Sequence, residues 1–374
     1  MQTTRNTNYC FKAKWFDEIA QLHRHYNIRY YVELHQIEII DTKSNKLFLK
    51  KTDCPAAVSA SDFYVGANVC IFGRRFELLD YLDASTREML TLERQRSLLI
   101  VKRAFICQIG IILDTLERQG CALSSLKLMQ IHSKEAEEFY STQSDQLEAA
   151  RLIASFIDGP IVAIEIVASN CVEKLVQLMP TVLVGRPQSG DTADLSCFEY
   201  PKTVAEVERY RNFFIDKLHN NIDTAQNCTC VVVLPHIVKK KLTGKVIEAI
   251  QASPESDVTA MESFHLDRAS AIDFLEVYDG VLPHYRDAVD HLVSGLCVAI
   301  RLEGKNTHNV VSDFRAYVGP WDVDMAKKLR PHTIRAKYGI DRICNAVHCT
   351  DLPEDGSSEC DFFFNILTNQ NKKL

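Results

Sequence analysis

Long apolar runs are missing from this sequence. No 18 consecutive residues are apolar, and the N-terminal segment MQTTRNTNYCFKAKWF lacks the apolar stretch of a secretory leader. Because a membrane-spanning helix needs about 20 apolar residues, we expect neither membrane insertion nor secretion. Basic residues are not in excess either, since 43 lysines and arginines stand against 49 acidic residues for a net charge of -6. This balance argues against nucleic acid as the main ligand.

Metal-binding and disulfide patterns are also absent. The 13 cysteines form no C-x-x-C pair, and the sequence contains neither H-E-x-x-H nor an EF-hand loop. An odd number of scattered cysteines is typical of reduced thiols rather than of a disulfide framework or a zinc site. We therefore expect an intracellular, cytoplasmic protein without a resident metal. The 374 residues, 46% hydrophobic and 25% charged, suit two or three folded domains.

Short apolar runs separated by turn residues fill the chain from residue 9 to about residue 82. The clearest runs cover residues 28–34, 36–40, 46–49, 68–73 and 76–80. Such a pattern predicts a small antiparallel barrel or sandwich, which we place within residues 1–90.

The order of motifs in this region, from Trp15 through Phe48 to the Gly-Arg-Arg-Phe segment ending at Phe76, resembles the DM-ten domain of ciliary proteins. The resemblance implies a pleckstrin-like fold that ties its host to axonemal microtubules. A simpler interpretation is that the three aromatic side chains only build a core, and fold likeness alone does not decide function.

An internal repeat follows a charged, helix-prone connector at residues 83–95. Residues 158–166, DGPIVAIEI, correspond to residues 294–302, SGLCVAIRL, and the strand-like run before each has a counterpart in the other copy. Both copies then alternate strands with amphipathic helices, as at residues 242–250. This order predicts two ferredoxin-like βαββαβ domains, at residues 91–222 and 223–374, and an α+β class for the whole chain.

The most informative stretch is NAVHCTD at residues 345–351, with Arg335 thirteen positions before His348. An imidazole that attacks a phosphate needs an orienting group and cations that bind the phosphate oxygens. A surface histidine in a polar loop is the simplest alternative. With the repeats around it, however, the stretch resembles the nucleoside diphosphate kinase family over about residues 95–216 and 228–370.

That resemblance implies ping-pong transfer of the γ-phosphate from a magnesium-bound nucleoside triphosphate. By position in the family motifs, His348 would be the nucleophile and Glu359 the acid that orients the imidazole. Asn345 would contact the sugar, and Arg315 and Arg335 would bind phosphate. Mg²⁺ would be required only together with nucleotide, and no other cofactor is implied.

Three departures from the family pattern weaken the second copy. The lysine that neutralises the transferred phosphate is replaced by Leu234, and the tyrosine that supports it aligns with Glu276, with nearby Tyr278 as an alternative for that role. Trp321 stands where a phosphate-binding threonine is expected. Because the loss of one preorganised phosphate contact typically costs on the order of a hundredfold in rate, we expect little or no turnover.

The first copy departs in a complementary way. It keeps Lys102 and Tyr140 at the lysine and tyrosine positions, whereas we place Phe198 at the position of the histidine and Leu195 at that of the asparagine. Lys102 and Leu234 are 132 residues apart but Phe198 and His348 are 150 apart, so the segment that carries the phosphate arginines is shortened. This copy is predicted to be a pseudoenzyme.

Three functions remain open. The resemblances favour a structural, microtubule-associated protein inside ciliary or flagellar axonemal doublets, with tubulin and other doublet proteins as partners. The alternative is a weakly active nucleoside diphosphate kinase that works through phosphorylated His348. Nucleotide binding without transfer is a third possibility, because Arg315, Arg335 and Asn345 could still hold phosphate and ribose.

Overall fold

The structure is a computed structural model that describes residues 7–17, 19–141, 145–184, 197–218, 223 and 225–371. The chain divides into two compact units. The first contains the residues up to 95 together with 265–295, and the second contains residues 96–264 and 296–373. Within the described residues, no helix is both long and apolar enough to cross a membrane.

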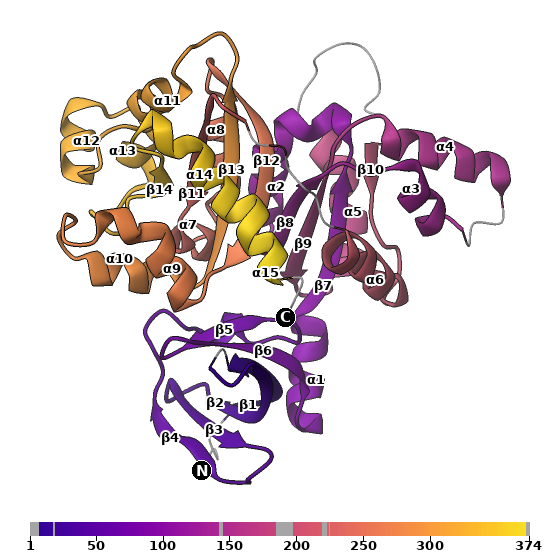
Figure 1. Cartoon of the computed structure of the whole chain (residues 1–374). Helices are drawn as coiled ribbons and strands as arrows, with labels where there is room; N and C mark the ends of the chain where they lie inside the picture. The colour runs from indigo at the N-terminus through magenta and orange to yellow at the C-terminus, as the bar shows by residue number, and fades with distance from the viewer. Residues whose placement is uncertain are drawn as a thin grey trace. The chain divides into compact units, whose positions relative to one another are not determined.

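The first unit is built on a six-stranded antiparallel sheet with the order β4-β3-β2-β1-β6-β5 (Figure 1). Its strands are β1 (Asn8–Asp17), β2 (Leu22–Tyr31), β3 (Gln36–Asp41), β4 (Leu47–Asp53), β5 (Asn68–Ile71) and β6 (Arg74–Tyr81). Alternate residues of β2, namely Tyr26, Ile28 and Tyr30, are buried, because successive side chains of a strand point to opposite faces. β4 and β5 stand at the two ends of the strand order, so they form the edges of this sheet.

Helix α1 (Ala84–Glu93) closes the first unit over the sheet. The Asp83 side chain accepts a hydrogen bond from the Thr86 backbone N–H at the helix N-terminus, and Leu90 is fully buried in the core of the sheet. The segment at residues 265–295 adds α9 (Arg268–Leu275) and α10 (Tyr285–Leu292), and the Arg75 guanidinium donates to the His265 carbonyl. The sheet and this segment are thus joined within one unit.

The second unit contains an eight-stranded sheet with the order β10-β7-β9-β8-β12-β13-β11-β14. The first repeat supplies β7 (Gln95–Val101), α2 (Ile109–Arg118), β8 (Ala122–Met129), α3 (Ser133–Phe139), α4 (Gln146–Ile157), β9 (Ile161–Ala168), α5 (Cys171–Val184), β10 (Phe198–Glu199) and α6 (Val204–Arg211). The second supplies β11 (Cys228–Val233), α7 (Pro235–Lys239), α8 (Thr243–Gln251), β12 (Ser256–His265), β13 (Leu296–Gly304), α11 (Val310–Val318), α12 (Val323–Leu329), α13 (Ile334–Tyr338), β14 (Val347–Cys349), α14 (Gly356–Asp361) and α15 (Thr368–Asn371). Each repeat has the strand order of a ferredoxin-like unit, so the predicted α+β class is confirmed.

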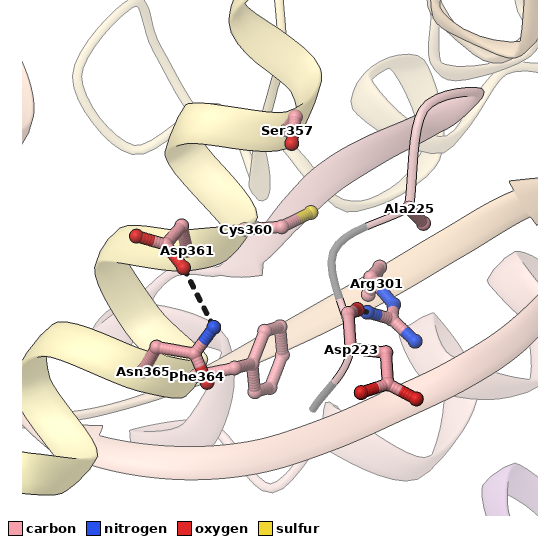
Figure 2. A pocket seen from close by; sticks show the side chains of 8 residues that line it. All are labelled: Asp223, Ala225, Arg301, Ser357, Cys360, Asp361, Phe364 and Asn365. Carbon is pink, nitrogen blue, oxygen red and sulfur yellow. Dashed lines mark hydrogen bonds between the residues drawn. The ribbon is translucent and has the colours of Figure 1, made fainter. Parts of the chain in front are cut away.

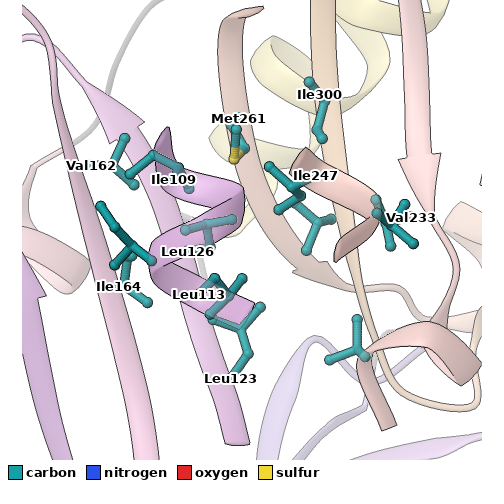
Figure 3. Packing of buried hydrophobic residues seen from close by; sticks show 14 of the residues in the cluster. Ile109, Leu113, Leu123, Leu126, Val162, Ile164, Val233, Ile247, Met261 and Ile300 are labelled. Carbon is teal, nitrogen blue, oxygen red and sulfur yellow. The ribbon is translucent and has the colours of Figure 1, made fainter. Parts of the chain in front are cut away.

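The two repeats meet along β8 and β12, which pair antiparallel at Lys127 and Glu262. The Ser263 hydroxyl accepts a hydrogen bond of 2.8 Å from the Leu126 N–H beside this pair. Apolar residues of both repeats contribute to one hydrophobic cluster, as Figure 3 shows for Leu113 and Ile247. The repeats consequently share a core and pair with each other inside one chain.

Glu117 is a buried acid at this junction. Its carboxylate on α2 accepts hydrogen bonds from the backbone N–H groups of Thr243 and Gly244 at the start of α8, at 3.2 and 2.9 Å. These bonds favour the ionised form, but burial outweighs them and raises the pKa of Glu117 above its usual 4.5. The Glu117 side chain thus links the two repeats, while its burial disfavours the ionised form.

This raised pKa makes a pH-dependent contribution to stability. A carboxyl group whose pKa is raised on folding stabilises the fold most below the ordinary value, and the contribution is lost as the pH rises through the raised value. We therefore expect Glu117→Gln, which cannot ionise, to gain stability relative to wild type as the pH rises above the ordinary value of 4.5 toward the raised pKa of Glu117. Urea unfolding of both proteins across this range measures the difference, and parallel pH profiles would contradict the assignment.

Candidate functional site

His348 lies at the middle of the short edge strand β14, opposite Val232 of β11. Its side chain is almost completely buried. Nε2 lies 2.9 Å from Oε2 of Glu359, and the hydroxyl of Thr350 donates to the same oxygen at 2.9 Å. Because Glu359 engages Nε2, any chemistry at this imidazole would use Nδ1.

A close helix-to-strand contact sets the position of Glu359. Gly356 opens α14, and a Cβ atom there would lie only 2.1 Å from the carbonyl oxygen of Cys228 on β11. Only glycine allows the helix to approach the strand so closely. This contact holds the helix that brings Glu359 to His348.

Arg335 is buried next to His348, but protein atoms already accept from its guanidinium. Nε and Nη2 donate to the carbonyl of Val347 at 3.3 and 3.1 Å, and Nη1 donates to the carbonyl of Gly319 at 3.0 Å. Nη2 also lies 3.8 Å from the sulfur of Cys349. Since the donors of an arginine form a fixed planar fork, these bonds compete directly with a phosphate.

Trp321 covers this arginine. The guanidinium carbon of Arg335 lies 5.1 Å from the centre of the indole ring, a cation–π arrangement. The loop that carries the indole is held by Gly319, whose φ of +94° requires glycine and which packs against Thr333. Replacing the threonine of the family by tryptophan therefore adds a partner for Arg335 rather than a phosphate donor.

The other two predicted ligands differ in exposure. Arg315 on α11 has a half-exposed side chain that binds the carbonyl and the carboxylate of Asp351 at 2.7 and 3.1 Å. Asn345 is buried, and its Nδ2 donates to the Arg342 carbonyl at 3.3 Å. Its Oδ1 makes no hydrogen bond to any described residue. Of the predicted ligands, Arg315 and Asn345 are thus best placed to contact a nucleotide.

Leu234 lies between the end of β11 at Val233 and the start of α7 at Pro235. Its backbone N–H donates to the carbonyl of Ala346 at 3.0 Å, and its side chain is buried and uncharged. Glu276 is exposed in the short helix Glu276–Tyr278 of the first unit. At neither position does the chain supply the cation or the hydroxyl of the family pattern.

Strand register identifies which residue of the first repeat corresponds to His348, and it corrects one prediction. Lys102 bonds to the carbonyl of Cys197 as Leu234 bonds to that of Ala346. Phe198 then pairs with Val101, as Val347 pairs with Val233. Glu199, and not Phe198, therefore stands at the position of the histidine. Leu195 lies outside the described residues.

Glu199 has a partner that matches Glu359. The hydroxyl of Tyr210 donates to Oε1 of Glu199 at 2.7 Å, and the separation of 11 residues equals that between His348 and Glu359. Burial and the Glu199 carboxylate raise the pKa of both Tyr210 and Tyr140, so both phenols stay neutral at physiological pH. A carboxylate–phenol pair replaces the imidazole–carboxylate pair, so the first repeat lacks the imidazole that a phosphohistidine requires.

Aromatic packing fills the space around this pair. Lys102 is buried, with its ammonium 2.8 Å from the Ser155 hydroxyl and 4.7 Å from the centre of the Phe156 ring. Tyr140 packs edge-on against the same ring, with centroids 5.5 Å apart. Lys102 and Tyr140 thus both lie against Phe156, in a packed core rather than an open site.

A separate small cavity lies beside α14 (Figure 2). It is lined by Asp223, Ala225, Arg301, Ser357, Cys360, Asp361, Phe364 and Asn365. Its volume of about 10 Å³ is at the lower limit for one water molecule, so it cannot hold a nucleotide.

Comparison with known proteins agrees with this architecture. The nucleoside diphosphate kinase family matches residues 95–189 and 227–367, and the DM10 domain matches residues 2–85. Nucleoside diphosphate kinase homolog 7 of Mus musculus is 31% identical over 98% of this chain and 95% of its own length, and the Rattus norvegicus protein gives the same values. A crystal structure of the Aquifex aeolicus nucleoside diphosphate kinase is 31% identical, with a TM-score of 0.34 over 38% of this chain and 97% of that chain.

These matches cover both repeats and the N-terminal sheet. The chain belongs to the nucleoside diphosphate kinase family and carries a DM10 domain at its N-terminal end.

Proposed function

We propose that this chain is a non-catalytic structural component of ciliary or flagellar axonemal doublets, in which it binds tubulin and neighbouring doublet proteins. The resemblance of its N-terminal domain to the DM-ten domain supports the location. The occupied phosphate-binding positions support the loss of catalysis. In this role the two kinase-like repeats act as a rigid, paired scaffold.

The contacts of Arg335 carry the non-catalytic part of the proposal. A phosphate-binding arginine has to offer its donors to the ligand in the transition state. Arg335 instead donates to Val347 and Gly319 and lies under Trp321. Position 234 is a leucine, and the donors of Arg335 are engaged by the protein. The second repeat therefore offers a phosphate neither of these two cations.

A weak nucleoside diphosphate kinase is the second candidate, and the bond between His348 and Glu359 favours it. In this reading Nδ1 of His348 attacks the γ-phosphorus of a magnesium-bound nucleoside triphosphate and forms an N–P bond. The bond from phosphorus to the bridging oxygen breaks, and the nucleoside diphosphate leaves with the electron pair. A terminal oxygen of a second diphosphate then takes the phosphoryl group from Nδ1.

Phosphohistidine labelling separates the two candidates. We expect purified chain incubated with Mg²⁺ and ³²P-labelled ATP to carry no acid-labile label, and to transfer phosphate at least about a thousandfold more slowly than a bacterial nucleoside diphosphate kinase assayed beside it. His348→Ala is the control for the labelled residue. Leu234→Lys tests whether one lost cation limits the reaction. Brisk wild-type turnover that disappears in His348→Ala would remove the scaffold-only proposal.

The proposed location needs its own test. Tagged full-length chain expressed in ciliated cells should remain with the axoneme after detergent extraction and should cosediment with doublet microtubules. A protein that is extracted completely with the soluble fraction would contradict the axonemal role, whatever the outcome of the labelling.

A further inference from the structure

The edge strand β4 of the DM10 domain has an unusual combination of side chains. Residues 42–52 contain four lysines and no acidic residue, and the lysines at positions 43, 46, 50 and 51 are all exposed. Leu47 and Phe48 lie between them and are 61% and 40% exposed. β4 (Leu47–Asp53) and the turn before it thus present positive charge and apolar surface together.

These lysines form no ion pair with the acidic residues that the structure describes. Among the described residues, no carboxylate lies within ion-pair distance of any of the four lysines, whereas Lys12 and Lys14 on β1 pair with Asp80 and Glu77. Asp53, the one acid on β4, accepts a hydrogen bond from Gln36 at 2.9 Å. Lys51 lies 3.7 Å from the centre of the Tyr31 ring, a cation–π arrangement. The charges of Lys43 and Lys46, in the turn before β4, and of Lys50 on the strand are therefore available to an external partner.

The backbone of β4 is also open on one side. Among the described strands, β4 pairs with β3 alone, with register shifts between Ile37 and Ile39 and between Ile39 and Ile40, and it lies at one end of the sheet (Figure 1). Arg74 lies 5.2 Å from the Trp15 ring and 5.3 Å from the Phe48 ring, and so adds a further cation beside the exposed phenylalanine. An edge strand offers a row of N–H and C=O groups to an extended segment.

Lysines on an edge strand often serve only to prevent aggregation. That role does not account for the exposed side chains of Leu47 and Phe48, because apolar side chains on an edge strand favour association with other chains. We propose that β4 docks an extended, acidic peptide segment of a partner protein as an added strand. Its glutamate or aspartate side chains would face the lysines, and its apolar side chains would cover Leu47 and Phe48.

The proposal is tested on the full-length chain with a fluorescein-labelled decapeptide in which glutamate and valine alternate. We expect saturable binding by fluorescence anisotropy, and slower hydrogen exchange of the amides of residues 47–53 when the peptide is bound. A Lys46→Glu, Lys50→Glu double variant should bind at least about tenfold more weakly, because it reverses two charges along the strand. Lys327→Glu with Lys328→Glu makes the same change in net charge on the exposed side of α12 and should leave binding unchanged.

A second peptide distinguishes strand addition from simple attraction between opposite charges. In the second peptide, proline replaces valine; it keeps the negative charge but cannot form a strand ladder. It should not bind. Equal binding of both peptides, equal binding by both double variants, or no binding of the glutamate–valine peptide to wild type would each overturn the proposal. Thermal unfolding of the variants verifies that the DM10 domain stays folded, so a loss of binding reports on the surface.

Discussion

Arg335→Ala should lower the free energy of unfolding of the second unit by about 3–5 kcal/mol, and not merely weaken a ligand contact. Arg335 is 5% exposed, and its guanidinium donates to the carbonyls of Val347 and Gly319. Truncation would leave both acceptors buried without this donor, at about 1–3 kcal/mol each, and would also remove packing against Trp321. Urea unfolding followed by far-UV circular dichroism measures the loss.

A neighbouring arginine supplies the matched control. Arg342 is exposed and pairs with Asp322 at 2.6 Å, so Arg342→Ala should cost less than about 1 kcal/mol. Arg335→Lys should recover only part of the loss, because an ammonium cannot reproduce the planar fork that reaches both carbonyls. If Arg335→Ala unfolded like wild type but lost nucleotide binding, Arg335 would be a phosphate ligand and the structural role would be wrong.

The difference between a ligand and a structural arginine could not be read from the sequence. Family likeness predicts what type of residue stands at position 335, and its spacing from His348 matches the family pattern. The direction of the guanidinium depends on Gly319 and Trp321, which are distant enough in the chain that only the folded loop brings them to it. A motif can thus be present in sequence while its donors serve the fold.

The correction at Glu199 has a related cause. The repeats can be aligned through the similar phenylalanine-rich segments near their ends, and this alignment puts Phe198 opposite His348. The strand pairing differs by one residue, and a shift of one residue in a strand moves every side chain to the other face. The equal separation of Glu199 from Tyr210 and of His348 from Glu359 is a sequence signal that could have indicated the correct register.

The fold itself was more predictable than the site. Apolar alternation predicted most strands of the DM10 domain, and the internal repeat predicted two ferredoxin-like units, because both signals depend on local periodicity. The pairing of the repeats through α2 and α8 rests on two glycines that no periodicity identifies. Gly110 and Gly244 have no Cβ atom, and this allows the backbones of α2 and α8 to approach each other closely.

Gly110→Ala and Gly244→Ala should each destabilise the second unit by about 3 kcal/mol or more. A Cβ at position 110 would lie 2.2 Å from the backbone nitrogen of Glu248, and one at position 244 would lie 2.0 Å from that of Asp114. Backbone atoms cannot rotate away as a side-chain end can, so α2 and α8 would have to separate. Intrinsic helix propensity predicts the opposite sign, a gain of up to about 1 kcal/mol for glycine to alanine within a helix. The sign of the change therefore decides between the two effects.

Tryptophan fluorescence gives a local measurement of this change. In a Trp15→Phe background Trp321 is the only tryptophan, and urea unfolding then reports on the second unit alone. Gly120→Asn is the control, because Gly120 lies in the same unit, has a φ of +86°, which asparagine tolerates, and has only the end of the Lys174 side chain, at 4.0 Å, near an added Cβ atom. We expect the control to stay within about 1 kcal/mol of wild type, while both alanine variants move the transition to lower urea. Unchanged midpoints in the alanine variants would mean that α2 and α8 do not approach closely in solution, and the shared core of the two repeats would then have to be abandoned.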